Sequence, residues 1–328
     1  MLATSVDHSI RSELAEAALA LEQAGISSAR LEAELLLAHV QGCSRMGLYL
    51  SANLSGSAKQ EFRQLVARRC NAEPLQYCIG IAWFYGLAFD IGPGAFIPRQ
   101  ETEILCQQAI HLLQHTAQPT RVIDLCCGPG TIGITLTKNV SDCRITAIDA
   151  SAEALSYARS NALRHGVEGR ITFIQKDIRS MDAANITSLP QADLLLCNPP
   201  YVPTASRSVL PADVLQEPWS ALDGGPDGLD FYRLLIPRWH SAVREGGLIL
   251  LEHGDDQGPA VAALLRETGA YDDIRHLRDL SGRERVVQAT LRVEPRQSTA
   301  SRVVLSDRRE SKGEEQRPTG NTRGASHG

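Results

Sequence analysis

The sequence predicts an α/β protein in which a helical bundle and a β-hairpin precede a doubly wound, mostly parallel sheet. Two observations carry this prediction. Apolar residues recur at helical spacing through the first seventy or so residues, whereas short apolar runs alternate with helical segments from about residue 100 onward. Alternation of strand and helix is typical of a parallel sheet covered by helices on both faces. Such sheets bind ligands at the carboxyl ends of their strands.

The boundaries of these parts follow from changes in pattern. The helical part begins with Ile10, Leu14 and Leu21 at helical spacing, and glycines then punctuate the aromatic and β-branched runs of the hairpin segment. Beyond Glu294 the chain becomes polar, which is typical of disorder. We therefore expect four segments: a helical domain at 1–73, a β-hairpin linker at 74–99, an α/β domain at 100–293 and a disordered tail at 294–328.

Composition excludes several classes of protein. The 328 residues include 33 Lys and Arg against 38 Asp and Glu, a net charge of −5, which argues against a protein that mainly grips phosphate backbones. Long apolar runs and a basic N-terminal flank are both lacking, so we expect no membrane span and no signal peptide. The eight cysteines form no CxxC pair, so we expect reduced thiols in the cytoplasm and no metal site.

A glycine-rich turn follows the first strand of the α/β part. Gly128, Gly130 and Gly133 match the spacing of a dinucleotide fingerprint, and Asp149 ends the next strand. The glycines allow close approach of the backbone to a ligand, and the Asp149 carboxylate can accept hydrogen bonds from two ribose hydroxyls. This pattern fits NAD, FAD or S-adenosylmethionine, and a plain tight turn is the alternative.

Two further acidic residues favour S-adenosylmethionine. Asp124 lies on the strand just before the turn, where it could bond the amino-acid end of that cofactor; the alternative is a carboxylate that caps the turn. Asp177, after the third strand, could accept a hydrogen bond from an adenine amino group while Ile178 covers the ring. A solvated loop acid is the alternative for Asp177.

The strongest motif is Asn198-Pro199-Pro200-Tyr201, which directly follows the apolar strand at 192–197. The two prolines stiffen the loop and contribute no N–H, so its carbonyls stay free to accept hydrogen bonds. The Asn198 side-chain carbonyl and the Pro199 backbone carbonyl could hold the two hydrogens of an –NH2 group. Tyr201 would supply a flat wall against a planar amide or base.

Eight blocks of the chain together resemble one family. They run in order from about Arg30 to Thr290: SARLEAELLLAHV (28–40), EPLQYCIG (73–80), FIPRQETE (96–103), DLCCGPG (124–130), NPPYVP (198–203), EPWSALDGGPDGLDFYR (217–233), LLEHGDDQG (250–258) and RDLSGRERVV (278–287). With these blocks the sequence resembles the HemK/PrmC family of protein-(glutamine-N5) methyltransferases. The resemblance implies a Rossmann-like S-adenosylmethionine-dependent methyltransferase sheet, with substrate recognition in the helical domain.

The resemblance also implies a substrate and a set of site residues. Family members methylate the glutamine of the Gly-Gly-Gln motif in peptide chain release factors, or a glutamine in a ribosomal protein; we expect a monomer without nucleic-acid partners. The residues expected to hold S-adenosylmethionine are Asp124, Cys126, Cys127, Gly128, Pro129, Gly130, Asp149, Asp177, Ile178 and Asn198. Asn198, Pro199 and Tyr201 are the expected catalytic residues, and Pro200 joins them in binding the glutamine amide.

Two positions depart from the family pattern. Members usually have glycine where this chain has Cys126 and a small residue where it has Pro129. The Cys126 side chain would lie close to the methionine part of the cofactor, and Pro129 lacks a backbone donor. A divergent branch with another substrate, or a non-catalytic cofactor-binding homologue, is therefore an alternative.

Other functions use some of the same motifs. A DNA adenine methyltransferase shares the Asn-Pro-Pro-Tyr chemistry but would need a basic cleft. An NAD-dependent oxidoreductase would leave the Asn-Pro-Pro-Tyr loop unexplained.

Several charged residues could take part in the glutamine reaction or shape its site. Glu252 or His253 could accept the proton that leaves the methylated nitrogen, with a structural role as the alternative. In the FIPRQETE block we expect Glu101 to pin the linker, and Arg99 and Glu103 to shape the site. Arg99 could form an ion pair with either glutamate.

Overall fold

The computed structural model describes residues 7–50, 54–116 and 119–293. Its first part is helical, and the helices pack around a core that includes Leu14, Leu36, Leu37 and Phe62. The first four helices are α1 (Asp7–Gln23), α2 (Ala29–Val40), α3 (Arg45–Leu48) and α4 (Gly56–Cys70). The predicted disordered tail at 294–328 lies outside the described residues, so its disorder stays a prediction.

The β-hairpin is shorter than the predicted linker. Helix α5 (Leu75–Ile79) precedes the two antiparallel strands β1 (Ile81–Phe84) and β2 (Leu87–Asp90). Pro74 begins this short helix, and Gly80 ends it with a left-handed φ of 77°, a conformation that glycine adopts without strain. The helix was not predicted because five residues are too few to reveal a helical period.

A seven-stranded sheet forms the α/β part, with the strand order β5-β4-β3-β6-β7-β9-β8. The strands are β3 (Thr120–Leu125), β4 (Cys143–Asp149), β5 (Ile171–Gln175), β6 (Ala192–Cys197), β7 (Val243–Glu252), β8 (Tyr271–Arg278) and β9 (Glu284–Leu291). All neighbouring pairs from β5 to β7 are parallel, and β9 is antiparallel to both β7 and β8. The predicted mostly parallel, doubly wound sheet is confirmed.

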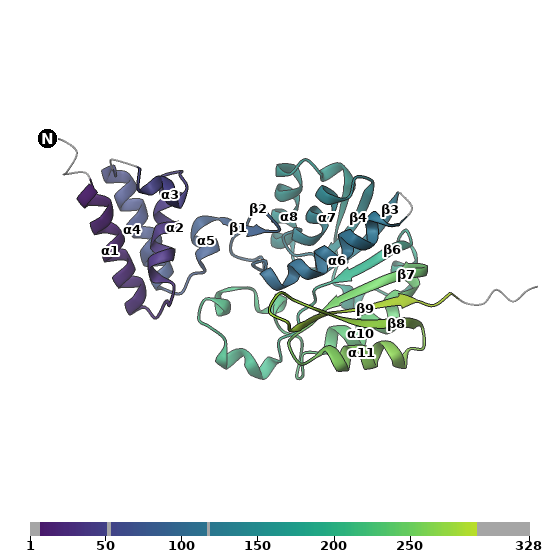
Figure 1. Ribbon diagram of the computed structural model, residues 1–328. Helices are drawn as coiled ribbons and strands as arrows, with labels where there is room; N and C mark the ends of the chain where they lie inside the picture. The colour runs from purple at the N-terminus through teal and green to yellow at the C-terminus, as the bar shows by residue number, and fades with distance from the viewer. Residues whose placement is uncertain (1–6, 51–53, 117–118, 294–328) are drawn as a thin grey trace, which may run out of the picture. The chain divides into compact units, whose positions relative to one another are not determined.

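Helices cover both faces of this sheet (Figure 1). One face packs α6 (Glu103–Gln114), α7 (Thr131–Asn139) and α8 (Ala152–Arg164), whereas the other packs α10 (Asp230–Trp239) and α11 (Gly258–Glu267). Val122 and Ile123, adjacent on β3, belong to the two different cores. Because successive strand residues point to opposite faces, a strand buried on both sides becomes a continuous apolar run.

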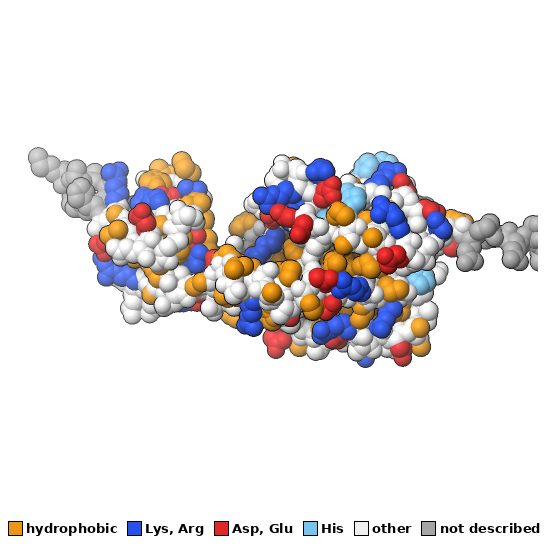
Figure 2. Space-filling view, turned by 90° about the horizontal axis from the view of Figure 1, so that it is seen from below, with side chains coloured by type: hydrophobic (Ala, Val, Ile, Leu, Met, Phe, Trp, Pro, Cys, Tyr) orange, Lys and Arg blue, Asp and Glu red, His pale blue; other side chains and the backbone are white. Residues whose placement is uncertain are grey.

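The short helix α9 (Ala183–Thr187) completes the described α-helices. None of the helices in the described ranges is long and apolar enough to cross a membrane. On the face seen in Figure 2, Lys and Arg side chains alternate with Asp and Glu side chains rather than forming a basic stripe.

Asn161, a fully buried residue of α8, joins the hairpin to the glycine-rich turn. Its Nδ2 donates to the backbone oxygens of Asp90 and Pro129, both at 3.1 Å, and its Oδ1 accepts from the Asp90 N–H at 2.6 Å. Buried backbone groups without partners are costly, so this side chain stabilises two loops at once.

Replacing Asn161 with alanine should lower the free energy of unfolding by about 3 kcal/mol, because buried backbone groups of Asp90 and Pro129 lose their partners. Urea denaturation measures the change. The matched control is Ser160→Ala: that exposed hydroxyl donates to the Asp90 carboxylate at 3.3 Å, and its loss should change stability by less than about 0.5 kcal/mol. Equal effects of the two substitutions would contradict this assignment.

Candidate functional site

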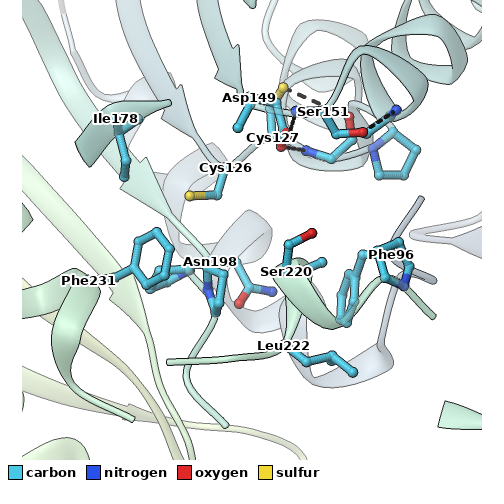
Figure 3. Close-up of a pocket in the computed structure, with 18 of the residues that line it drawn as sticks. Phe96, Cys126, Cys127, Asp149, Ser151, Ile178, Asn198, Ser220, Leu222 and Phe231 are labelled. Carbon is cyan, nitrogen blue, oxygen red and sulfur yellow. Dashed lines mark hydrogen bonds between the residues drawn. The ribbon is translucent and has the colours of Figure 1, made fainter. Parts of the chain in front are cut away.

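A cavity of about 350 Å³ opens at the carboxyl ends of β3, β4, β5 and β6 (Figure 3). Its volume lies within the range usual for small-molecule sites. The predicted site residues that line it are Cys126, Cys127, Gly128, Pro129, Asp149, Asp177, Ile178, Asn198, Pro199, Pro200 and Tyr201. The carboxyl ends of parallel strands thus bring together residues from four separate segments.

The glycine-rich turn between β3 and α7 is built from left-handed residues. Cys126, Gly128 and Gly130 have φ values of 57°, 55° and 82°. Gly130 is the N-cap of α7, and a Cβ there would meet the Cβ of Ala158 at 3.1 Å, so this position favours glycine on two grounds. Cys126 adopts the same region with a side chain, which is uncommon for a non-glycine residue. Figure 3 shows its sulfur pointing toward the side of the cavity where Ile178 and Phe231 lie.

The Asp149 carboxylate holds this turn in place. Its Oδ2 accepts from the Gly128 N–H at 2.8 Å, and its Oδ1 accepts from the Ser151 N–H at 2.9 Å. Burial raises the pKa of Asp149, and these backbone hydrogen bonds oppose the rise. Each carboxylate oxygen can accept a second hydrogen bond, so Asp149 retains the capacity to bind a pair of hydroxyls.

Asp124 and Gly130 are the two predicted site residues that do not line the cavity. Asp124 is fully buried, and its Oδ2 accepts from the Gly133 N–H at 3.1 Å. Burial raises its pKa to about 7. The structure therefore gives Asp124 the alternative role of bonding the turn, because its side chain lies behind the turn rather than at the cavity wall.

Asp177 and Ile178, which follow β5, line another part of the cavity wall. The Asp177 carboxylate accepts from the backbone N–H of Arg179 at 2.9 Å and pairs with its guanidinium at 2.8 Å, which lowers the Asp177 pKa. Ile178 is buried and lies on the same side of the cavity as Phe231. The wall therefore combines an ionised carboxylate with an apolar surface.

Asn198 follows the last residue of β6, and its side-chain amide is hydrogen-bonded to Thr102. The Asn198 Nδ2 donates to the Thr102 Oγ1 at 3.2 Å, and that hydroxyl donates to the Oε1 of Glu252 at 3.0 Å. Among the described residues no group donates to the Oδ1 of Asn198, which remains able to accept a hydrogen bond. Figure 3 shows Asn198 between Phe231 and Ser220.

The backbone of the Asn-Pro-Pro-Tyr loop is held by residues that sequence reasoning missed. Gln257 donates from Nε2 to the Tyr201 carbonyl at 2.9 Å. A Cβ on Gly224 would lie 2.7 Å from the Tyr201 Cα, and one on Gly228 would lie 2.2 Å from the Tyr201 oxygen. Only glycine permits this close approach. Gly224 and Gly228 belong to the block at 217–233, which carried part of the family resemblance. The sequence thus marked these glycines, but it did not reveal that they pack against Tyr201.

The prediction for the FIPRQETE block is partly wrong. Arg99 lines the cavity as expected, but its ion pair is with buried Glu217 rather than with Glu101 or Glu103. Glu103 Oε1 accepts from the Tyr85 N–H at 2.7 Å, so Glu103 makes the kind of hairpin contact that was expected of Glu101. Glu217 also accepts from the Ile97 N–H at 2.9 Å. These partners lie far apart in sequence, so spacing could not identify them.

These features together define a class. The glycine-rich turn after β3, the acidic residue that ends β4 and Asn-Pro-Pro-Tyr after β6 together fit the site expected of an S-adenosylmethionine-dependent amino-methyltransferase. In agreement, residues 117–277 match the model described as methyltransferase domain, and residues 13–80 match the PrmC N-terminal domain.

Relatives then identify the family. A release factor glutamine methyltransferase of Moorella thermoacetica is 40% identical over 287 residues, covering 87% of this chain and 99% of that protein. One from Geobacter sulfurreducens is 36% identical, covering 81% of this chain and 91% of its own length. The chain belongs to the release factor glutamine methyltransferase family.

A solved structure of a protein-(glutamine-N5) methyltransferase (release factor-specific) from Alicyclobacillus acidocaldarius is 27% identical to this chain. It covers 62% of this chain and 100% of its own, with a TM-score of 0.37. The family assignment therefore depends on the sequence relatives.

The cavity fits the cofactor that this family uses. Asp149 offers a carboxylate at the wall, and Ile178 and Phe231 offer apolar surface, which together suit a ribose and an adenine ring. Cys126, for which the family resemblance leads us to expect glycine, places its side chain at the cavity wall.

Replacing Cys126 with glycine should tighten the binding of S-adenosylmethionine severalfold, because it removes a side chain from the cavity wall. Glycine also adopts the left-handed conformation of this position without the strain of about 1 kcal/mol that a side chain brings. Cys126→Val should weaken binding, since a β-branched residue is more strained at positive φ. Isothermal titration calorimetry measures both, with Cys70→Ala in α4 as a control that should leave affinity unchanged. Weaker binding by the glycine variant would show that the thiol contributes to the site.

Proposed function

We propose that this chain methylates the side-chain amide nitrogen of the glutamine in the Gly-Gly-Gln motif of a peptide chain release factor, and so acts in translation termination. The observation that carries the proposal is the position of Asn198: its Oδ1 is unpartnered among the described residues, and its Nδ2 is bonded to Thr102. Family membership supports the choice of glutamine. Cytoplasmic location and a monomeric state remain predictions from the sequence.

S-adenosylmethionine, when bound, supplies an electrophilic methyl group on a sulfonium sulfur. The residues proposed to contact it are Cys126, Cys127, Gly128, Pro129, Asp149, Asp177, Ile178 and Asn198, all of which line the cavity. Asp124 and Gly130 would act indirectly, through the shape of the turn.

An amide nitrogen is a poor nucleophile because its lone pair is delocalised into the carbonyl group. Hydrogen bonds from both of its N–H groups to the Asn198 Oδ1 and the Pro199 carbonyl would increase the electron density on nitrogen. The same two dipoles would stabilise the positive charge that develops as the N–C bond forms and the methyl–sulfur bond breaks, and the surplus proton on nitrogen would then pass to water. Pro199 and Pro200 keep these acceptors fixed, so no reorganisation is needed when the substrate arrives.

Tyr201 would form a wall against the planar amide. Its side chain lines the cavity, and its backbone is fixed by Gln257. Burial raises the pKa of the Tyr201 hydroxyl, so the phenol stays neutral at physiological pH. A neutral aromatic ring packs against an amide without adding charge to the pocket.

The distribution of charge supports a protein substrate over DNA. The chain is acidic overall, with a net charge of −5, and acidic and basic side chains alternate on the face seen in Figure 2. A DNA adenine methyltransferase would need a basic surface to bind phosphates.

Incubation with tritiated S-adenosylmethionine and, separately, purified release factor, ribosomal protein and duplex DNA tests the substrate. We expect label only on the release factor, at the glutamine of its Gly-Gly-Gln motif when the protein is digested and sequenced by mass spectrometry. Label on the ribosomal protein or on DNA alone would overturn the proposed substrate.

Replacing Asn198 with alanine should lower kcat by about 100-fold or more, since one of the two preorganised acceptors is lost. Affinity for S-adenosylmethionine should change only a few-fold, because Asn198 is one of many lining residues. Single-turnover methylation and calorimetry separate the two effects. Asn185→Ala, on an exposed position of α9, is the control. Near-normal turnover by the Asn198 variant would rule out the assigned role.

A further inference from the structure

Glu252 is a buried carboxylate that the proposed mechanism does not use. It ends β7, and its residue is 1% exposed. Its Oε1 accepts from Thr102, while its Oε2 has no hydrogen-bond partner among the described residues. Tyr232 donates to the Glu252 backbone oxygen at 2.6 Å, so the end of the strand is fixed. A buried acid in such a position calls for an explanation, because an unpaired carboxylate is costly.

The charge of Glu252 decides which groups donate and which accept in the hydrogen bonds of Thr102. A threonine hydroxyl has one hydrogen to donate, and an ionised carboxylate can only accept. When Glu252 is ionised, Thr102 must donate to it, and the hydroxyl lone pairs are left to accept from Asn198. The atom of Asn198 that faces Thr102 is then its Nδ2, and its Oδ1 is turned to the cavity.

We propose that Thr102 and ionised Glu252 are positioning residues that set the orientation of the Asn198 amide, so that its oxygen rather than its nitrogen faces the substrate. This inference rests on the proposed function, because a glutamine –NH2 group requires an acceptor at that point. Neither residue touches the substrate. Thr102 is 4% exposed at the cavity wall and is bonded to the Asn198 amide, and Glu252 is not part of the wall.

Protonation of Glu252 removes the constraint. A protonated carboxyl can donate to Thr102, which can then donate to the Asn198 Oδ1, and the amide can turn its –NH2 group toward the substrate. The –NH2 group of Asn198 and the –NH2 group of the substrate glutamine, both hydrogen-bond donors, would then face each other. The ionised form is therefore the competent one, and activity should rise with pH as Glu252 ionises.

The surroundings of Glu252 place its ionisation near neutrality. Burial raises its pKa to about 8, opposed by the hydrogen bond from Thr102 and by the charge of Arg285 on β9. Glu101 raises it further. The remaining ionisable groups that interact with Glu252 are Cys106 on α6, Cys197 on β6, Tyr201 after β6 and Tyr232 on α10; burial raises the pKa of each, so all are neutral in this range.

Substitution of Thr102 tests the orientation. Thr102→Val should lower kcat about tenfold to a hundredfold at pH 8.5, with the affinity for S-adenosylmethionine unchanged, because Asn198 loses its anchor. Thr102→Ser, which keeps the hydroxyl, should restore kcat to within about threefold of wild type. The matched control is Thr135→Val, a buried threonine of α7 whose hydroxyl has no partner in the described ranges; it should turn over normally. A Thr102→Val enzyme with wild-type kcat would overturn the proposal.

The pH profile tests Glu252 directly. With tritiated S-adenosylmethionine and purified release factor at saturation, wild-type kcat should rise between pH 6.5 and 9 with a midpoint near the pKa of about 8. Glu252→Gln is neutral throughout and should lack this rise. Asp124, whose pKa is about 7, is retained in the variant, so any contribution from it stays in both profiles. A Glu252→Gln profile with the same midpoint and amplitude as wild type, or a wild-type rate that falls with pH, would overturn the proposal.

The outcomes separate this inference from the proposed function. If wild-type enzyme does not label the release factor, the proposed function fails. If the wild type labels it and Asn198→Ala is inactive, but Thr102→Val and Glu252→Gln match wild type in rate and pH profile, only the positioning role fails. Should Glu252→Gln not fold, as thermal denaturation would reveal, the Thr102 pair of variants still decides the question.

Discussion

The parallel pairing of β3 with β6 is the constraint on which the site depends. Its register matches Leu125 with Cys197, so the residues that follow, Cys126 and Asn198, begin two adjacent loops at one edge of the sheet. The loop after β3 forms the cofactor side of the cavity, and the loop after β6 forms the proposed amide side. A shift of one residue in this pairing would turn the side chains of one strand to the opposite face and separate the two halves of the site.

Buried polar side chains hold the loops that the sheet brings together. Asn161 is hydrogen-bonded to the glycine-rich turn, and Glu217 is hydrogen-bonded to the Ile97 N–H. Gln257 is hydrogen-bonded to the Tyr201 carbonyl, and Thr102 is hydrogen-bonded to the Asn198 amide. Each bond joins residues at least 32 positions apart in sequence. A loop that carries binding residues has few partners of its own, so its geometry depends on groups supplied by rigid elements.

The sequence was sufficient to predict the parts of this arrangement that have local signals. The apolar runs at β3 and β6 marked two central strands, glycine spacing marked the turn, and two prolines marked the rigid loop. The contributions of Thr102, Glu217 and Gln257 could not be predicted, because a single polar residue gives no period or motif and its partner is decided by the fold. Asp124 is a different case: its position before the turn fits a ligand contact, which stays a prediction, and its Oδ2 accepts from the Gly133 N–H.

The central claim is that Asn198 and the Pro199 carbonyl accept both hydrogens of a glutamine amide. A crystal structure of the enzyme with S-adenosylhomocysteine and a Gly-Gly-Gln peptide tests this claim most directly. The account predicts the glutamine nitrogen about 2.7–3.2 Å from both the Asn198 Oδ1 and the Pro199 oxygen, with Thr102 still bonded to the Asn198 Nδ2. A glutamine whose carbonyl oxygen faces Asn198, or whose nitrogen lies away from this loop, would contradict it.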